Sequence, residues 1–297
     1  MREEPRGYRD ENDLRLIRRM LLANCVADER RAIVDFCHFL TLANGATLAA
    51  LRLWEDEGGA PLAFAWSFAG FVDVVSDARR RDAEAQALAW EEARARAAGL
   101  ASLSTVADEQ DAWRTAMLSE RGYTAGESAA YYAARRLDEP LPGAALPAGY
   151  ELATMTGELS DIARRAAAQS AALPWSPIDA EGYAAVMRAP GYRRELDLHA
   201  VAPDGALAAF VTMWLDEETR VGVLEPVGCA EAHRRRGLSM ALIAEGLARL
   251  RELGASRVYV GNGPVRERAD EPGPPRRLYA RAGFREFSRM PVWSRAL

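Results

Sequence analysis

A run of three arginines and a glycine, Arg234–Gly237, stands between a predicted β-strand and a predicted α-helix. The strand covers Arg220–Gly228 and the helix covers Leu238–Leu253. The first turn of a helix presents unpaired backbone N–H groups and about half a positive charge, so it attracts anions. The glycine and the small Ser239 let a phosphate approach the backbone closely. The stretch therefore predicts a diphosphate-binding turn, although an isolated basic run before a helix is more often a solvated surface.

Other nucleotide-binding loops and lysine chemistry are excluded by the sequence. It has no GxxxxGK[ST] motif, and no GxGxxG motif follows the first strand of either half. It also contains no lysine, so a Schiff-base mechanism is excluded.

The cysteines and histidines are dispersed and lack the spacing of metal ligands, so we expect no metal site. They are Cys25, Cys37, Cys229, His38, His199 and His233. Cys229 lies at the end of the strand before the turn, where a thiol could form an acyl-enzyme. No activating histidine neighbours it in sequence, so we interpret Cys229 as a small core residue. For His233, a phosphate or solvent contact is the preferred interpretation.

Composition and charge indicate a cytoplasmic globular protein. Of the 297 residues, 49% are hydrophobic and 27% are charged. The formal net charge of −5 argues against nucleic acid as the main partner. Met1–Asn12 has no apolar segment of a signal peptide, and the apolar run Leu207–Leu215 is far shorter than the ~18 residues that span a bilayer. We therefore expect no membrane association.

A proline-rich segment divides the chain into two halves of similar size. Leu137–Gly149 (LDEPLPGAALPAG) has no periodic pattern and is typical of a linker. A chain of 297 residues is long for one compact domain and sufficient for two. We predict an N-terminal domain over residues 1–136, a linker over 137–149 and a C-terminal domain over 150–297.

The two halves repeat the same order of elements. In each, two helical stretches precede a β-hairpin and a third strand; three arginines, a long helix, a short strand, a second helix and a closing strand follow. In the first half the helical stretches, the two hairpin strands, the third strand, the arginines, the short strand and the end of the second helix lie at Asn12–Thr41, Leu51–Glu57, Pro61–Phe68, Phe71–Val75, Arg79–Arg81, Ala101–Val106 and Met117–Tyr123. The second half shows them at Glu158–Arg188, Asp197–Ala202, Leu207–Leu215, Arg220–Gly228, Arg234–Arg236, Ser256–Val260 and Leu278–Phe284. Helices around a mostly antiparallel sheet predict a duplicated α+β fold.

The second half resembles the GNAT acyltransferase superfamily in two motifs that stand in the family's order. Arg234–Ser239 (RRRGLS) matches the [R/Q]-x-x-G-x-[G/A] turn, with Ser239 where glycine or alanine is usual. Leu278–Phe284 (LYARAGF) matches the L-Y-x-x-x-G-F signature. The chain is most similar to tandem members of the superfamily, such as mycothiol synthase and similar actinobacterial proteins. The resemblance implies two tandem GNAT-like domains, but the motifs occur only in the second.

The resemblance implies an N-acetyltransferase that moves an acetyl group from acetyl-CoA to a small-molecule amine by direct attack. Tyr279 would be the acid that protonates the departing thiolate. Glu225 would be the base, or would anchor a substrate ammonium, and a backbone N–H near Val227 would polarise the carbonyl. The residues implied in cofactor binding are Val227, Gly228, Cys229, Arg234, Arg235, Arg236, Gly237, Leu238, Ser239, Met240 and Asn262.

The strand before the turn carries both a proline and the candidate base. Pro226 cannot donate a ladder hydrogen bond, which agrees with the bulge that the family has in this strand. Glu225 shares a strand face with Val227 and Cys229 by the two-residue period, so we expect its side chain to point at the cofactor cleft.

The first half lacks the residues that would bind the cofactor. When the two arginine triplets are aligned, Asp82 falls opposite Gly237 and Glu84 falls opposite Ser239. Two carboxylates would repel a diphosphate, and an unpaired buried carboxylate is costly. Leu118 falls opposite Tyr279, so the phenol is missing too. We expect the first half to bind no coenzyme A.

Two other functions stay open at this stage. A non-catalytic acyl-CoA sensor would need neither Tyr279 nor Glu225. A protein N-acetyltransferase would need an open cleft, which a tandem partner domain tends to close. The acceptor pocket is formed by loops that the sequence does not place, with Trp175, Tyr192 and Trp214 as candidate lining residues.

A Gly/Pro-rich insert, Gly263–Pro275, separates Asn262 from the second motif by more than is usual in the family. This insert is a candidate lid over the substrate or the cofactor. The duplication can replace a homodimer, so a monomer or a homodimer is expected.

Overall fold

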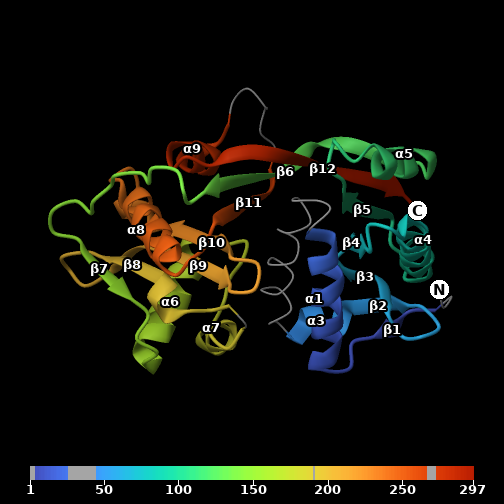
Figure 1. The fold of residues 1–297 in the computed structure, drawn as a ribbon, viewed down its shortest axis with the longest axis horizontal. Coiled ribbons are helices and arrows are strands. Elements are labelled where there is room, and N and C mark those ends of the chain that lie inside the picture. Colours follow the sequence, from blue (N-terminus) through green and yellow to red (C-terminus); the bar gives the residue numbers. More distant parts are fainter. Residues whose placement is uncertain (1–3, 26–44, 190, 266–271) are drawn as a thin grey trace. The chain divides into compact units, whose positions relative to one another are not determined.

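The computed structural model describes residues 4–25, 45–189, 191–265 and 272–297 (Figure 1). The chain forms two compact units of mixed α and β structure, which confirms the predicted α+β class. Unit 1 consists of Met1–Tyr131, Gly263–Arg268 and Ser288–Leu297. Unit 2 consists of Tyr132–Asn262 and Ala269–Phe287.

Unit 1 contains a sheet whose strands follow the order β1-β2-β3-β4-β5-β12. Parallel pairing is recorded only between β4 and β5; the other neighbours in this order pair antiparallel. Its elements are β1 (Arg6–Gly7), α1 (Glu11–Cys25), α3 (Gly45–Ala50), β2 (Leu51–Glu55), β3 (Pro61–Phe68), β4 (Phe71–Ser76), α4 (Arg81–Ala97), β5 (Ser102–Val106), α5 (Ala112–Glu120) and the first part of β6 (Thr124–Arg136).

Unit 2 contains strands in the order β6-β11-β10-β9-β8-β7, with β10 and β11 parallel. Its elements are β7 (Glu151–Thr154), α6 (Leu159–Ala172), α7 (Ala180–Val186), the 3₁₀-helix η1 (Arg194–Leu196), β8 (Asp197–Val201), β9 (Leu207–Asp216), β10 (Val221–Cys229), the 3₁₀-helix η2 (Glu231–His233), α8 (Leu238–Glu252), β11 (Arg257–Val265), α9 (Pro274–Arg281) and the start of β12 (Arg285–Ala296).

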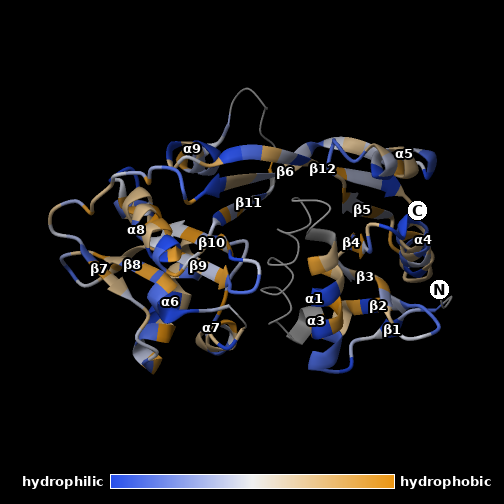
Figure 2. Cartoon of the chain, in the orientation of Figure 1, coloured by the Kyte–Doolittle hydropathy of each residue, from blue (hydrophilic) through white to orange (hydrophobic). Residues whose placement is uncertain are grey.

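The core of unit 2 lies between α8 and the strands of the sheet on which this helix packs. Every residue of β9 is buried, as expected for a central strand with both faces covered. Figure 2 shows hydrophobic residues over β8 and α8, whereas the arginine-rich α9 is mostly hydrophilic. A Cβ atom at Gly246 would lie 2.6 Å from the Met213 side chain, so α8 packs very closely on β9 at that point.

The helices before the hairpin of unit 2 agree with the predicted two helical stretches. Within the predicted range Glu158–Arg188 they are α6 and α7. Pro174 follows the end of α6 and disfavours helical geometry at the residue before it, which explains the break. In the first half, α1 ends at Cys25, and the rest of the predicted stretch to Thr41 lies outside the described residues.

The closing strands of the two halves are exchanged between the units. The C-terminal strand β12 pairs antiparallel with β5, from Val292 opposite Val106 to Ala296 opposite Ser102, and this part of it belongs to unit 1. The end of β6 belongs to unit 2, where β6 neighbours β11. Each unit is therefore completed by a strand from the other half of the sequence.

Candidate active site

A β-bulge in β10 exposes the candidate base. Leu224 lies opposite Met213 and Val227 lies opposite Val211, so Glu225 and Pro226 together face a single residue of β9. Proline is tolerated at such a site because the bulged strand leaves the hydrogen-bonded ladder. The parallel pairing of β10 with β11 ends at Val223 and Tyr259, just before the bulge. The expected bulge at Pro226 is thus confirmed.

The indole of Trp214 fixes the backbone of the bulge. Its Nε1–H donates a hydrogen bond of 2.6 Å to the carbonyl oxygen of Glu225. The Glu225 side chain is exposed. The extra residue interrupts the two-residue alternation, so the period that linked Glu225 to Val227 and Cys229 does not by itself determine where this side chain points.

Tyr279 of α9 lies close enough to Glu225 for the two to interact electrostatically. Burial raises the pKa of the Tyr279 phenol, and the Glu225 carboxylate raises this pKa further. Its ring packs edge-on against Phe284, with centroids 6.1 Å apart. No described residue forms a hydrogen bond with its hydroxyl. The phenol therefore stays protonated at neutral pH and is available as a proton donor.

The basic turn after β10 is open. Arg234, Arg235 and Arg236 are exposed, as is Gly237, which precedes α8 with a left-handed φ of 81°. A Cβ atom at Gly237 would meet nothing within 4 Å, so there is space over the helix start. Arg234 Nε donates a 3.4 Å hydrogen bond to the Cys229 carbonyl. Among the described residues, no carboxylate forms an ion pair with any of the three guanidinium groups.

The first residues of α8 anchor the turn. Leu238 is buried in the core, while Ser239 and Met240 are half-buried. His233, just before the arginines, pairs with Tyr150 through a 2.9 Å contact between Nδ1 and the phenol oxygen. The helix start therefore has a fixed apolar base and a polar, uncovered surface.

The strand residues before the turn pack tightly and offer no nucleophile. A Cβ atom at Gly228 would lie 2.1 Å from the Phe210 ring, so no side chain fits there. Val227 and Cys229 pack against the core of unit 2. Burial raises the pKa of the Cys229 thiol. Because the reactive form of cysteine is the thiolate, this environment favours an inert residue.

Asn262 lies on β11, near the end of the described part of that strand. Its side-chain Nδ2 is buried and has no hydrogen-bond partner among the described residues. An orphaned buried donor of this kind is available to a ligand carbonyl. The insert after it, Gly263–Pro275, is only partly described, because residues 266–271 lie outside the described ranges.

The arginine triplet of unit 1 is paired throughout. Arg79 forms an ion pair of 2.7 Å with Asp77, and Arg80 forms one of 2.8 Å with Asp82. Arg81 contacts Glu84 at 3.1 Å and Asp111 at 3.0 Å. The same triplet that is open in unit 2 is therefore neutralised by the chain's own carboxylates in unit 1.

A buried arginine that sequence reasoning missed lies between the strands of unit 1. Arg114 of α5 donates hydrogen bonds to the carbonyl oxygens of Val74 (3.0 Å) and Val106 (2.9 Å), one on β4 and one on β5. It also forms an ion pair with Glu84, which accepts a 2.8 Å hydrogen bond from Ser76. This buried pair occupies the place where the two parallel strands separate.

The counterparts of this pair in unit 2 carry no charge. Aligning MLSERGY with LYARAGF places Pro275 opposite Arg114, and the triplet alignment places Ser239 opposite Glu84. A proline and a serine replace the two charged groups, so this ion pair has no equivalent in unit 2. The sequence alignment already shows this difference, because the charged Arg114 stands opposite the uncharged Pro275.

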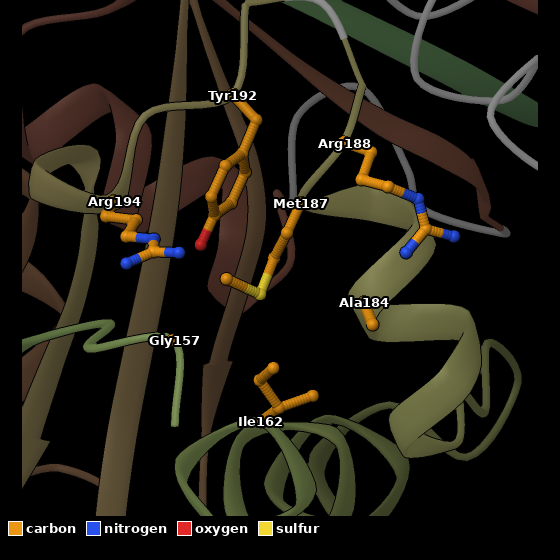
Figure 3. A pocket seen from close by; sticks show the side chains of 7 residues that line it. All are labelled: Gly157, Ile162, Ala184, Met187, Arg188, Tyr192 and Arg194. Atoms are coloured by element: carbon orange, nitrogen blue, oxygen red, sulfur yellow. The ribbon is translucent and has the colours of Figure 1, made fainter. Parts of the chain in front are cut away.

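A cavity of about 360 Å³ opens in unit 2, between α6, α7 and the segment leading to η1 (Figure 3). Its lining residues are Gly157, Ile162, Ala184, Met187, Arg188, Tyr192 and Arg194. The Tyr192 ring packs edge-on against Trp214 with centroids 5.6 Å apart, so one wall contacts the residue that holds Glu225. Of the three aromatic candidates, Tyr192 lines this cavity, Trp214 lies behind it and Trp175 is 77% exposed.

A buried polar cluster supports this wall. Asp197 accepts hydrogen bonds from the hydroxyls of Tyr183 (2.5 Å), Tyr192 (2.8 Å) and Thr212 (3.1 Å). Burial raises the pKa of Asp197, but the hydrogen bond with His199 and the charge of Arg165 lower it more, to about 2. The carboxylate is thus ionised and fixes the orientation of Tyr192.

The described residues contain neither a membrane-spanning helix nor a cluster of metal ligands. No described helix is long and apolar enough to cross a membrane. Nor do the described residues contain a group of three or more His, Cys, Asp or Glu side chains that could hold a metal ion.

Comparison with known proteins places these motifs in a family. Residues 167–284, which include the bulge, the basic turn and Tyr279, match the model of the acetyltransferase (GNAT) family. The matched segment lies in the C-terminal half of the chain. A search of curated proteins gave no significant match.

Solved structures extend the likeness to both units. A GCN5-related N-acetyltransferase from Sphaerobacter thermophilus is 20% identical, with a TM-score of 0.67 over 98% of this chain and 94% of its own. A tandem GNAT protein from the clavulanic acid biosynthesis pathway is 18% identical, with a TM-score of 0.68 over 99% and 97%. A GNAT protein from Kribbella flavida is 18% identical, with a TM-score of 0.52 over 78% and 86%. The predicted tandem GNAT fold is confirmed.

Proposed function

We propose that this protein is an N-acetyltransferase that uses acetyl-CoA to acetylate the amine of a small molecule, and that only unit 2 binds the cofactor. The observation that carries the proposal is the contrast between the two arginine triplets. Ion pairs neutralise the triplet of unit 1, whereas the triplet of unit 2 has no carboxylate partner among the described residues. Unpaired arginines at an open helix start are suited to a diphosphate.

The cofactor would lie along β10 and the start of α8. The backbone of Val227–Cys229 would pair with the pantetheine arm, and the N–H groups of Gly237–Met240 would bind the diphosphate together with the arginines. The buried, unpartnered amide of Asn262 is a further donor for the arm. Residues of unit 1 at the matching turn are engaged with one another, so we expect one cofactor per chain.

Acetyl-CoA supplies a thioester carbonyl that a neutral amine attacks, with the coenzyme A thiolate as the leaving group. The backbone N–H at Val227 would stabilise the negative charge on the carbonyl oxygen. Glu225, exposed on the bulge, would accept the proton from the amine directly or through a water, or would bind the substrate ammonium before attack. Tyr279, whose raised pKa keeps it protonated, would donate a proton to the departing sulfur.

Isothermal titration of the full chain with acetyl-CoA tests this proposal, with Gly237→Asp as the control. One site per chain, lost in Gly237→Asp, is expected because the new carboxylate repels the diphosphate. Two sites would contradict the interpretation of unit 1, and no binding would overturn the proposal.

Release of free thiol in the presence of amines then tests the transfer itself. Turnover with at least one small amine is expected. Intact cofactor binding with no turnover on any small amine or peptide N-terminus would instead favour an acyl-CoA sensor. Turnover on peptides alone would indicate a protein N-acetyltransferase.

A further inference from the structure

We propose that Trp214 is a positioning residue for the transfer reaction, because it holds the β10 bulge that carries Glu225 from the side of β9. Phe210 supports the other end of the same bulge. Both side chains act through the backbone of β10 and not on the substrate. This inference rests on the reaction proposed above and adds the residues that keep its reacting groups in place.

Trp214 binds the first end of the bulge. It lies opposite Val223, and its Nε1–H donates a 2.6 Å hydrogen bond to the carbonyl oxygen of Glu225. Two residues of β10 face one residue of β9 in the bulge, so the regular ladder is interrupted and the indole supplies a donor to this carbonyl. Because Trp214 is buried, its N–H would lose its partner if the carbonyl moved away. The hydrogen bond therefore resists displacement of Glu225.

Phe210 contacts the other end of the bulge. It lies opposite Gly228, and a Cβ atom at Gly228 would come within 2.1 Å of the Phe210 ring, so this ring lies directly against the β10 backbone. The two-residue period of a strand puts Phe210, Thr212 and Trp214 on one face of β9. The bulge therefore lies between two contacts that are made by the same face of β9.

One buried carboxylate holds a partner of each ring. The Arg165 Cζ lies 3.7 Å from the centre of the Phe210 ring, and its Nε lies 3.4 Å from a carboxylate oxygen of Asp197. Tyr192 packs edge-on against Trp214 and donates a 2.8 Å hydrogen bond to the same carboxylate. Hydrogen bonds are strong in such a buried setting, so the positions of the two rings are fixed together.

The strand pairing on the other side of β10 stops short of the bulge. β10 and β11 pair from Val221 opposite Arg257 to Val223 opposite Tyr259. The arm of acetyl-CoA would pair with β10 beyond this point, so contacts from β9 are suited to set the position of the bulge. The bulge carries the candidate base and leads to the Val227 N–H, and a misplacement of about 1 Å can lower a rate by about 10².

Trp214→Phe tests the proposal, because phenylalanine keeps a ring against Tyr192 but cannot donate to the Glu225 carbonyl. With the small amine that gives the highest turnover in the thiol-release assay, we expect kcat to fall by about tenfold or more. The Kd of acetyl-CoA should change by only about twofold or less, because the diphosphate would bind at the basic turn.

Trp54→Phe in unit 1 is the matched control. Trp54 is also buried and packs edge-on against Trp90 with centroids 5.8 Å apart, but its Nε1 has no hydrogen-bond partner among the described residues. The control loses the same part of a buried indole without loss of a hydrogen bond, so its kcat should stay unchanged.

Hydrogen–deuterium exchange of the segment 224–229 gives a readout that needs no activity. Exchange there should be faster by about tenfold in Trp214→Phe and unchanged in Trp54→Phe, because only the first variant releases the bulge. Tyr192→Phe removes only the hydroxyl that binds Asp197. It should change kcat and the exchange rate in the same direction by less, and it decides the question if Trp214→Phe does not fold.

The outcomes separate this inference from the proposed reaction. Faster exchange together with a lower kcat supports it. Unchanged exchange, or faster exchange with an unchanged kcat, would overturn it while leaving the N-acetyltransferase intact. Absence of transfer by the wild type would instead refute the proposed reaction, and the exchange rates would still decide whether Trp214 holds the bulge.

Discussion

Arg114 and Glu84 form a buried ion pair in unit 1, between the strands β4 and β5. The guanidinium also binds a carbonyl oxygen of each strand, so the pair ties the two strands together where they diverge. In unit 2 the aligned positions hold a proline and a serine, and the residues around them match an acetyltransferase family. Unit 1 thus fills the space between its two diverging strands with a stabilising ion pair. We propose that unit 2 uses the corresponding space to bind a cofactor.

Removing one partner of this pair should destabilise unit 1 strongly. Arg114→Met removes the buried ion-pair partner of Glu84 and leaves the partly exposed Arg81 at 3.1 Å, so we expect a loss of up to about 3–5 kcal/mol of unfolding free energy. The double variant Arg114→Met/Glu84→Gln should be less destabilised than the sum of the single variants, because it removes both charges. Urea denaturation followed by circular dichroism measures this; Arg80→Gln, which breaks an exposed pair, is the control and should change little. Equal effects of Arg114→Met and Arg80→Gln would refute the assignment.

The two arginine triplets should differ in their effect on acetyl-CoA affinity. Arg235→Gln/Arg236→Gln removes two unpaired cations from the proposed diphosphate site, so the Kd should rise by about tenfold or more. The matched variant Arg79→Gln/Arg80→Gln removes paired cations from unit 1 and should leave the Kd unchanged. Calorimetry at one fixed ionic strength gives both values, since salt screens such interactions. A similar rise of the Kd in both variants would contradict the proposal that only the triplet of unit 2 binds the cofactor.

Tyr279→Phe should lower kcat by about 10² while the fold is retained, because the ring can still pack on Phe284. The pH dependence gives a second test. The Glu225 carboxylate raises the pKa of Tyr279, so Glu225→Gln should move the loss of activity at alkaline pH to a lower value. Full pH–rate profiles of both variants give the acid limb and the alkaline limb separately. An unchanged kcat in Tyr279→Phe with chemistry rate-limiting would remove the tyrosine from the mechanism.

Unit 2 should lose stability in acid through Asp197. The pKa of this carboxyl falls from 3.8 to about 2 on folding, so the ionised form stabilises the fold above pH 3.8 and this contribution disappears as the pH falls towards 2. The advantage of the wild type over Asp197→Asn in unfolding free energy should shrink by about 2 kcal/mol across that window. Denaturation at pH 7, 4 and about 2.5 measures it, and a pH-independent difference would contradict the prediction.

Local patterns in the sequence predicted the elements that carry the site. The strand, basic turn and helix around Gly237 depend on neighbouring residues, as does the LYARAGF segment that carries Tyr279, and the structure contains them. The proposed roles of these residues stay predictions. The order of elements in the two halves was likewise predictable, because hydrophobic periodicity and turn residues are local signals.

Contacts between distant residues could not be predicted in this way. The Arg114–Glu84 pair joins residues 30 apart, and a charged residue on a predicted helix does not reveal its partner. The bulge at Glu225 was implied by family resemblance, but the Trp214 hydrogen bond that fixes it depends on the register of β9. Strand patterns also do not specify which strand lies next to which, so the exchange of β6 and β12 was missed.

That exchange has a consequence for how the protein is made. Ser104 of β5 and Ser294 of β12 form a hydrogen bond across 190 residues of chain. On the ribosome, β5 therefore emerges long before the strand that covers its edge, and unit 1 must wait with an unpaired edge while unit 2 is synthesised. Cutting the chain at the proline-rich segment would not yield two self-sufficient proteins, because each fragment would keep a strand that the other requires.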